Sequence, residues 1–155
     1  MGYAERVLQP GEAVAYRAKL HWILMAPGIV LTTASGLLSI AAAVKAGPDL
    51  RMALLGLSLI LFLFGGYQLL QAWLRRISTE IIVTNRRIIL KTGLVGRQSI
   101  EMNLDKIESV LVNQGVLGRL LDFGTLVIRG VGSGLEPITN VAAPLEFHKH
   151  LNEPR

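Results

Sequence analysis

The sequence contains no cysteine. Disulfide scaffolds, iron–sulfur clusters, thiolate zinc sites and thiol catalysis are therefore excluded. Charged residues are also scarce: they make up 17% of the 155 residues, against roughly a quarter in typical soluble domains. Disordered segments and nucleic-acid-binding tails need high charge and low hydrophobicity, so the composition disfavours both.

Apolar residues are abundant instead. They form 51% of the chain, and the mean hydropathy is +0.46. The net charge of +5 comes from basic residues that are scattered but become denser where two apolar segments end. This distribution is typical of a surface facing anionic lipid rather than of a nucleic-acid-binding protein. The composition predicts a small membrane protein with no nucleic-acid partner.

Two segments, residues 22–44 and 52–74, carry no formal charge. A membrane-spanning helix needs about 20 apolar residues, so each segment is long enough to cross a bilayer. The connection, residues 45–51, has the composition of a turn, which predicts a two-helix hairpin. A cleaved signal peptide fits the first segment poorly, because Glu5 and Glu12 precede it and the apolar run is long. A buried soluble hairpin is disfavoured, because little else in the chain could cover two such helices.

Basic residues flank the predicted hairpin on its terminal side: Arg17, Lys19, Arg75 and Arg76. The connecting loop carries only Lys45 and Arg51, with Asp49 between them. The excess of Lys and Arg predicts a multi-pass protein of the bacterial inner (plasma) membrane, with both termini in the cytoplasm. Trp22 and Trp73 are expected to anchor the two helices at the membrane interface.

Small residues recur along both segments. They are Thr32, Ser35, Gly36, Ser39 and Ala43 on the first, and Ala53, Gly56, Gly65 and Gly66 on the second. Small residues allow membrane helices to approach closely. We favour packing of the two helices on each other over a dedicated oligomer interface, although a homo-oligomer stays open.

The rest of the chain has the pattern of strands and turns. Apolar residues alternate with polar ones, which is typical of half-buried antiparallel strands. The predicted strands are residues 12–20, 78–84, 87–93, 97–103, 107–113, 124–130 and 135–141. A helix is expected from Pro144. The fold class is therefore an α+β membrane protein: a transmembrane hairpin plus a bent antiparallel sheet or open barrel, capped by a C-terminal helix. Residues 1–21 and 75–155 are expected to form one domain, and residues 12–20 to pair with the later strands.

Several motifs resemble the bacterial pleckstrin-homology-like (PH) membrane proteins. They are the runs 79–89 and 91–94 around Thr84-Asn85-Arg86-Arg87, the run 114–125, residues 144–147, the N-terminal run 8–12 and the pair His21-Trp22. The resemblance covers nearly the whole chain. It implies a PH-like domain in the cytoplasm, with the hairpin inserted after the first strand.

No enzyme signature is present, and no cofactor or metal is expected. His148 and His150 stand two residues apart, so on a helix they point about 200° apart and cannot chelate one ion. The acidic residues Glu101, Asp105 and Glu108 are interpreted as a solvated edge. The glycine-rich run 130–134 lacks the lysine and helix start of a phosphate loop and is interpreted as a turn.

A set of basic residues is the remaining candidate site. Arg17, Lys19, Arg75, Arg76, Arg86, Arg87 and Lys91 are expected to contact anionic headgroups, mostly nonspecifically. The function predicted is a non-enzymatic inner-membrane protein that presents a PH-like domain as an interaction or assembly module. Its partners would be membrane lipids and a membrane or cytoplasmic protein. The alternative is a membrane sensor that binds anionic lipid headgroups.

Overall fold

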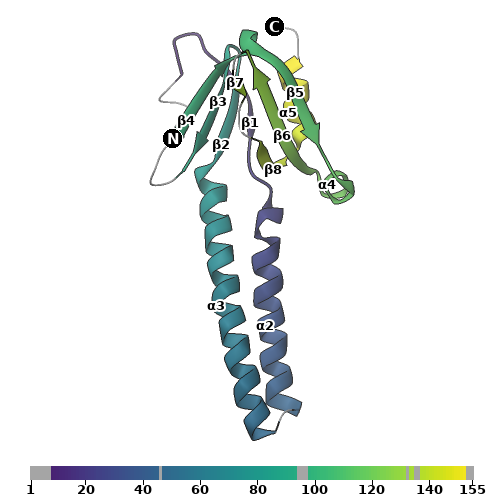
Figure 1. Ribbon diagram of the computed structural model, residues 1–155. Coiled ribbons are helices and arrows are strands. Elements are labelled where there is room, and N and C mark those ends of the chain that lie inside the picture. Colours follow the sequence, from purple (N-terminus) through teal and green to yellow (C-terminus); the bar gives the residue numbers. More distant parts are fainter. Residues whose placement is uncertain (1–7, 46, 94–97, 132, 135–136, 153–155) are drawn as a thin grey trace. The chain divides into compact units, whose positions relative to one another are not determined.

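The computed structural model of the chain describes residues 8–45, 47–93, 98–131, 133–134 and 137–152. The chain divides into two compact units (Figure 1). One is the helical unit Trp22–Leu74, and the other, here called the β unit, joins Met1–His21 to Arg75–Arg155.

The helical unit is a hairpin. A short 3₁₀ turn, η1 (Trp22–Met25), leads into helix α2 (Ala26–Lys45), and helix α3 covers Pro48–Ser78. The expected loop 45–51 is too long, because α3 already begins at Pro48, a residue that the first turn of a helix tolerates well. Helix α3 also runs past the expected end at residue 74, so its last turn, with Arg75 and Arg76, belongs to the β unit.

The two helices pack closely through small residues. A Cβ on Gly65 would lie 2.9 Å from Thr32 Cγ2, and one on Gly28 would lie 2.7 Å from Leu69 Cγ. The Ser39 and Ser58 hydroxyls are 2.9 Å apart and hydrogen-bonded. The contact face of α2 has a seven-residue repeat typical of left-handed helix pairs: Gly28, Thr32, Ser35, Ser39 and Ala42. The prediction that small residues pack the hairpin together is therefore confirmed.

The predicted contact face was wrong in part. Gly36, Gly56 and Gly66 have open space where a side chain would stand, and Ala43 is exposed. Ala42, Ser58 and Ala72 are buried instead. Spacing fixes which residues share a face, but only the partner helix decides which face is covered.

The outward surface of the hairpin is apolar. Ile40 and Leu37 are each 64% exposed, and α3 exposes Phe62, Leu63 and Phe64. Both helices are long and apolar enough to cross a membrane by length and composition, and only 11% of each apolar window is buried. Exposed apolar surface of this kind marks a site of interaction with a membrane or with another protein.

The described residues of the β unit form two four-stranded antiparallel sheets. The first has the order β1 (Val14–Ala18), β2 (Glu80–Thr84), β3 (Arg87–Thr92), β4 (Gln98–Asn103). The expected pairing of residues 12–20 with the later strands is present, because Tyr16 faces Val83 and Ala18 faces Ile81 across the β1–β2 ladder.

The second sheet is built around β6 (Phe123–Gly130). Strand β5 (Ile107–Asn113) pairs with one edge, and β7 (Ser133–Gly134) and β8 (Ile138–Ala142) pair with the other. A 3₁₀ turn, η2 (Leu104–Lys106), joins β4 to β5, and a short helix, α4 (Val116–Leu121), joins β5 to β6. Strand β5 has the predicted bounds, whereas β2 begins later than predicted. The first two residues of the predicted strand 135–141 lie outside the described residues. The short β7 lies inside the run interpreted as a turn.

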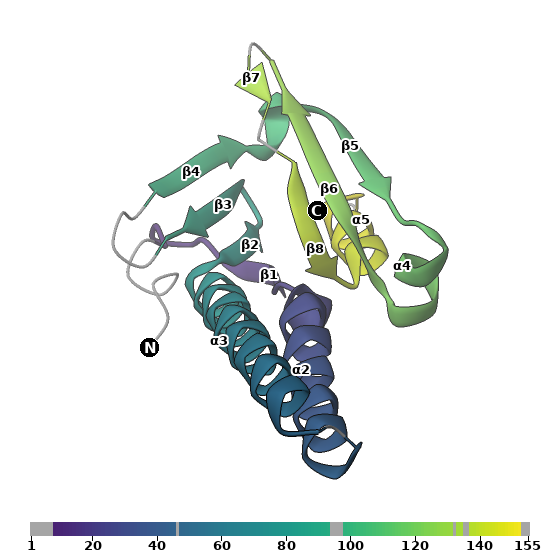
Figure 2. The ribbon, with the colours of Figure 1, turned by 60° about the horizontal axis from the view of Figure 1, so that its bottom comes forward.

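The two sheets meet where β1 ends. Leu20 pairs with Val141 of β8, and the Ala142 amide donates to the Lys19 carbonyl at 2.9 Å. Helix α5 (Pro144–Asn152), predicted from Pro144, packs on β1, β5 and β6 (Figure 2). Its Phe147 is fully buried, with Ile81, Ile88 and Leu126 among the other core residues. The α+β class is confirmed, and the described strands form two antiparallel sheets. The bent sheet or open barrel stays a prediction.

Candidate functional site

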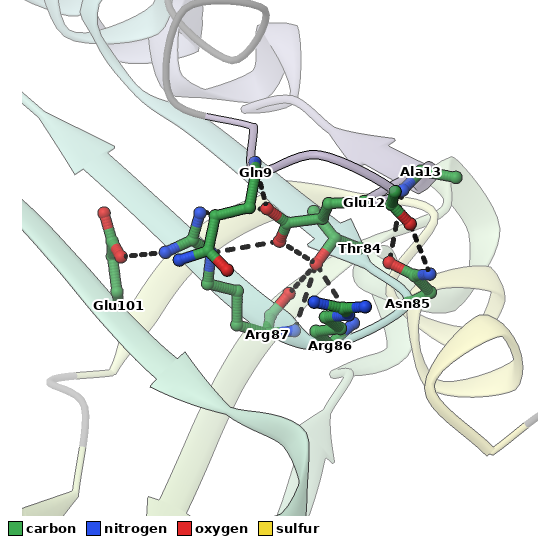
Figure 3. A network of polar contacts seen from close by, with 9 residues as sticks. Gln9, Glu12, Ala13, Thr84, Asn85, Arg86, Arg87 and Glu101 are labelled. Atoms are coloured by element: carbon green, nitrogen blue, oxygen red, sulfur yellow. Dashed lines mark hydrogen bonds and ion pairs between the residues drawn. The ribbon is translucent and has the colours of Figure 1, made fainter.

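The carboxylate of Glu12, whose side chain is 1% exposed, lies at the centre of a network of hydrogen bonds in the β unit. The Arg87 guanidinium binds this carboxylate side-on through two hydrogen bonds: Nε donates to Oε1 at 3.0 Å and Nη2 donates to Oε2 at 2.9 Å. The Gln9 amide donates to Oε2 at 2.9 Å, and the Thr84 hydroxyl donates to Oε1 at 2.7 Å. Figure 3 shows this arrangement, which we call the Glu12 latch.

The latch fastens the segment before β1 to the turn between β2 and β3. The Thr84 hydroxyl accepts hydrogen bonds from the amides of Arg86 and Arg87, which shapes the turn. The Asn85 amide donates to the Ala13 carbonyl at 3.1 Å, and its side-chain oxygen accepts from the Ala13 amide. Gly11 has φ +82°, a conformation that favours glycine and lets the chain bend back to place Glu12.

Hydrogen bonds set the protonation state of the Glu12 carboxylate. Burial by itself raises the pKa of Glu12, but hydrogen bonds from Arg87, the Gln9 amide and Thr84 outweigh burial and lower that pKa to about 2. The hydrogen bond to Glu12 is also the main cause that raises the pKa of Arg87, against burial. Arg87 Nη1 further donates to Glu101 at 2.6 Å. Glu12 therefore stays ionised and fully bonded at neutral pH, so it is a structural anion rather than an acid or base catalyst.

An open cleft of about 780 Å³ lies beside the latch. Besides Glu12 and Arg87, its walls include Arg86, Asn103 and Asp105. The Arg86 side chain is exposed. A second depression, of about 520 Å³, has Leu20, Leu90 and Ile138 on its walls, with Arg75 on the last turn of α3.

The predicted basic residues fall into separate groups. One group lies where the chain leaves and re-enters the β unit and consists of Lys19, Arg75 and Arg76. Arg76 Nε donates to the Leu20 carbonyl at 3.1 Å, which holds the two chain segments together at this point. All three are exposed, as is Arg17 on β1. Arg86 and Arg87 lie at the opposite end of β2, a five-residue strand of about 17 Å. Lys91 is half-buried opposite Glu80.

Arg87 is held inside the β unit, and its expected contact with lipid stays a prediction. Its side chain is 12% exposed and bonded to two carboxylates, Glu12 and Glu101. The sequence shows two adjacent arginines, and only the fold distinguishes the exposed Arg86 from the buried Arg87.

The two tryptophans lie at one end of the hairpin. Trp22 is 46% exposed and Trp73 is 50% exposed. Since Gly28 packs on Leu69, the start of α2 and the end of α3 lie side by side, and both indoles belong to that end of the unit.

Comparison with protein families gives a match to the bacterial PH domain over residues 22–155, which includes the hairpin and every strand except β1. The chain belongs to the bacterial PH domain family. No curated protein and no solved structure gives a significant match. Strand β1 and Glu12 lie outside the matched residues, so the latch joins an N-terminal segment to the Thr84–Arg87 turn inside the matched PH domain.

Two histidines of this PH domain, His21 and His150, take part in ring contacts. His150 on α5 stacks on Tyr16 at 4.9 Å between ring centroids, and His21 stacks on Phe123 at 5.3 Å. Burial lowers the pKa of His21, and the nearby Arg76 lowers it further. Within the described residues, no group of three or more His, Asp or Glu side chains could hold a metal ion.

Two features were missed by sequence reasoning. The pairing of Glu12 with Arg87 is one, because nothing in the sequence around Glu12 indicates that it meets Arg87. The apolar face of α4 is the other, although Val116, Leu117, Leu120 and Leu121 have the spacing of one helix face. That spacing was the available signal.

Proposed function

We propose that the hairpin holds this bacterial PH domain at the cytoplasmic face of the bacterial plasma membrane, where it serves as a non-enzymatic interaction or assembly module. PH domains commonly bind lipids or proteins, and the family is generally non-enzymatic.

The observation that carries the proposal is the pairing of β1 with β2. Strand β1 precedes the hairpin and β2 follows it, yet Arg17 faces Ile82 in one ladder. Two strands of one sheet must lie on the same side of a membrane, so the chain between them crosses an even number of times. The exposed apolar surface of both helices supports two crossings.

Charge supports the cytoplasmic side. Lys19, Arg75 and Arg76 are exposed at the end of the β unit where the hairpin begins and ends. Basic residues within a few positions of a membrane helix favour the cytoplasm, and each adds about 1 kcal/mol of attraction to an anionic leaflet. We therefore propose Arg17, Lys19, Arg75 and Arg76 as the lipid-contact set. Arg86, in the cleft at the other end of β2, and Lys91 are lesser candidates.

Topology reporters test membrane placement. A reporter at the C-terminus is expected to indicate the cytoplasm, and one inserted at Gly47, between α2 and α3, is expected to indicate the far side of the membrane. A chain recovered in the soluble fraction, or a reporter at Gly47 that stays cytoplasmic, would refute the hairpin proposal.

In-cell crosslinking distinguishes the module from the lipid sensor. Two variants are compared. In one a photoreactive residue replaces Arg86 in the cleft, and in the other it replaces Lys19, which is proposed to lie near the membrane. The module predicts protein adducts from Arg86 and lipid adducts from Lys19. The observation that favours a sensor is the exposed basic cluster of Lys19, Arg75 and Arg76. A sensor predicts lipid adducts from position 19 that are enriched in one anionic headgroup, and no protein adducts from either position. Adducts with a second copy of the chain would identify a homo-oligomer.

A further inference from the structure

Helix α4 is covered with exposed apolar side chains. Val116 is 88% exposed, Leu120 is 79% exposed and Leu117 is 65% exposed, with Leu121 at 37%. A short helix on a soluble domain normally turns such residues toward the core. Helix α4 instead turns its apolar side chains away from the core of the β unit.

The packing of α4 fixes this orientation. Gly118 is the buried residue, and a Cβ there would lie 2.6 Å from the Phe123 carbonyl oxygen. Gln114 Nε2 donates to that carbonyl at 3.2 Å. At 100° per residue, Val116, Leu120, Leu117 and Leu121 form one arc of about 140°. Gly118 lies to one side of the arc and the exposed Arg119 to the other.

The place of α4 in the β unit indicates what covers it. Phe123, which follows α4, pairs with Ala142 across the β6–β8 ladder. The Ala142 amide donates to the Lys19 backbone carbonyl at 2.9 Å. The Phe123 ring stacks on His21, and His21 directly precedes Trp22, the first residue of the hairpin. The base of α4 is therefore held beside the residue at which the chain enters the helical unit.

We infer that α4 is a second membrane contact, which inserts Val116, Leu117 and Leu120 into the boundary between headgroups and acyl chains. The inference rests on the proposed hairpin, which brings a bilayer to His21. A six-residue helix is about 9 Å long, comparable to the headgroup region of about 6 Å on each side of the hydrocarbon core. Apolar residues bordered by a basic one, as Arg119 borders this arc, are the composition of interfacial helices.

The absence of cysteine allows a direct test with single-cysteine variants of the full chain in nanodiscs of phosphatidylcholine and phosphatidylglycerol. Leu120→Cys samples α4, and Glu108→Cys, exposed at the other end of β5, is its control. Ile40→Cys, outward on α2, reports the hairpin. Each variant carries a fluorescent nitrobenzoxadiazole label. We measure how strongly this fluorescence is quenched by lipids that carry a spin label either near the headgroup or deep in the acyl chain.

The expected result is strong quenching of position 120 by the shallow spin label, of position 40 by the deep one, and little quenching of position 108. A charged maleimide, which needs no fluorophore, should react with unlabelled Leu120→Cys about tenfold more slowly than with Glu108→Cys. Quenching at 40 with none at 120 would overturn the inference and leave the hairpin intact. Protection from maleimide without quenching would mean that protein covers α4, which also overturns it. No quenching at 40 would instead refute the proposed function.

Discussion

Glu12 and Arg87 are 75 positions apart in the sequence, and they form a buried, side-on ion pair through two hydrogen bonds of 3.0 and 2.9 Å. One residue precedes the hairpin and the other follows the first strand after it. The pair therefore closes the β unit across the whole inserted hairpin, next to the ladder that joins β1 to β2.

Breaking the pair from the cationic side should be costly. Arg87→Met leaves the Glu12 carboxylate buried without its partner, and we expect the β unit to lose about 3 kcal/mol of stability. Pulse proteolysis of the full chain in micelles across a urea series measures this loss. Glu108→Gln, an exposed change outside the latch, is the control and should leave the midpoint unchanged. Equal midpoints for both variants would contradict an energetic role for the latch.

Acid should release the latch. The pKa of Glu12 is lowered from 4.5 to about 2 in the folded chain, so the ion pair stabilises the fold fully above pH 4.5. That stabilisation is lost as the pH falls from about 4.5 toward 2, since the unfolded chain takes up the proton first. The stability difference between the unmodified chain and Glu12→Gln should shrink over this window. A difference that stays constant from pH 6 to pH 2.5 would show that Glu12 titrates normally.

Strand β1 should be required for a soluble β unit. A fragment of residues 75–155 leaves the β2 edge unpaired and removes Val14 from Ile82 and Ile89, so we expect it to aggregate. Residues 3–21 joined to 75–155 by a short flexible linker should be monomeric and unfold cooperatively, as measured by light scattering and thermal circular dichroism. If the shorter fragment is already monomeric and equally cooperative, β1 is dispensable.

Two neighbouring glycines should respond differently to the same change. Gly65→Leu places a side chain 2.9 Å from Thr32 Cγ2 and 3.0 Å from the Thr32 backbone, which forces α2 and α3 apart. Overpacking of this kind costs about 1–3 kcal/mol. Gly66→Leu meets nothing within 4 Å and is the matched control. Titration from mild detergent into dodecyl sulfate, followed by helicity, should show a lower midpoint only for Gly65→Leu. A lower midpoint for both would place the helix contact elsewhere.

The sequence by itself determined the features that depend on local pattern. Uncharged runs located the two long helices, alternation located β5 to the residue, and Pro144 marked the start of α5. These features follow from hydrophobic periodicity, strand alternation and the fixed φ of proline, all of which act within a few residues.

Only the tertiary structure decided how these elements use their side chains. Arg86 and Arg87 are adjacent and chemically identical, yet one is exposed and the other is held by Glu12 and Glu101. Gly65 is buried against α2 while Gly66 is not, and α4 turns its apolar arc outward because Gly118 is the residue that fits against Phe123. Each outcome depends on a contact with another segment of the chain. The local sequence pattern does not indicate which residue that contact brings.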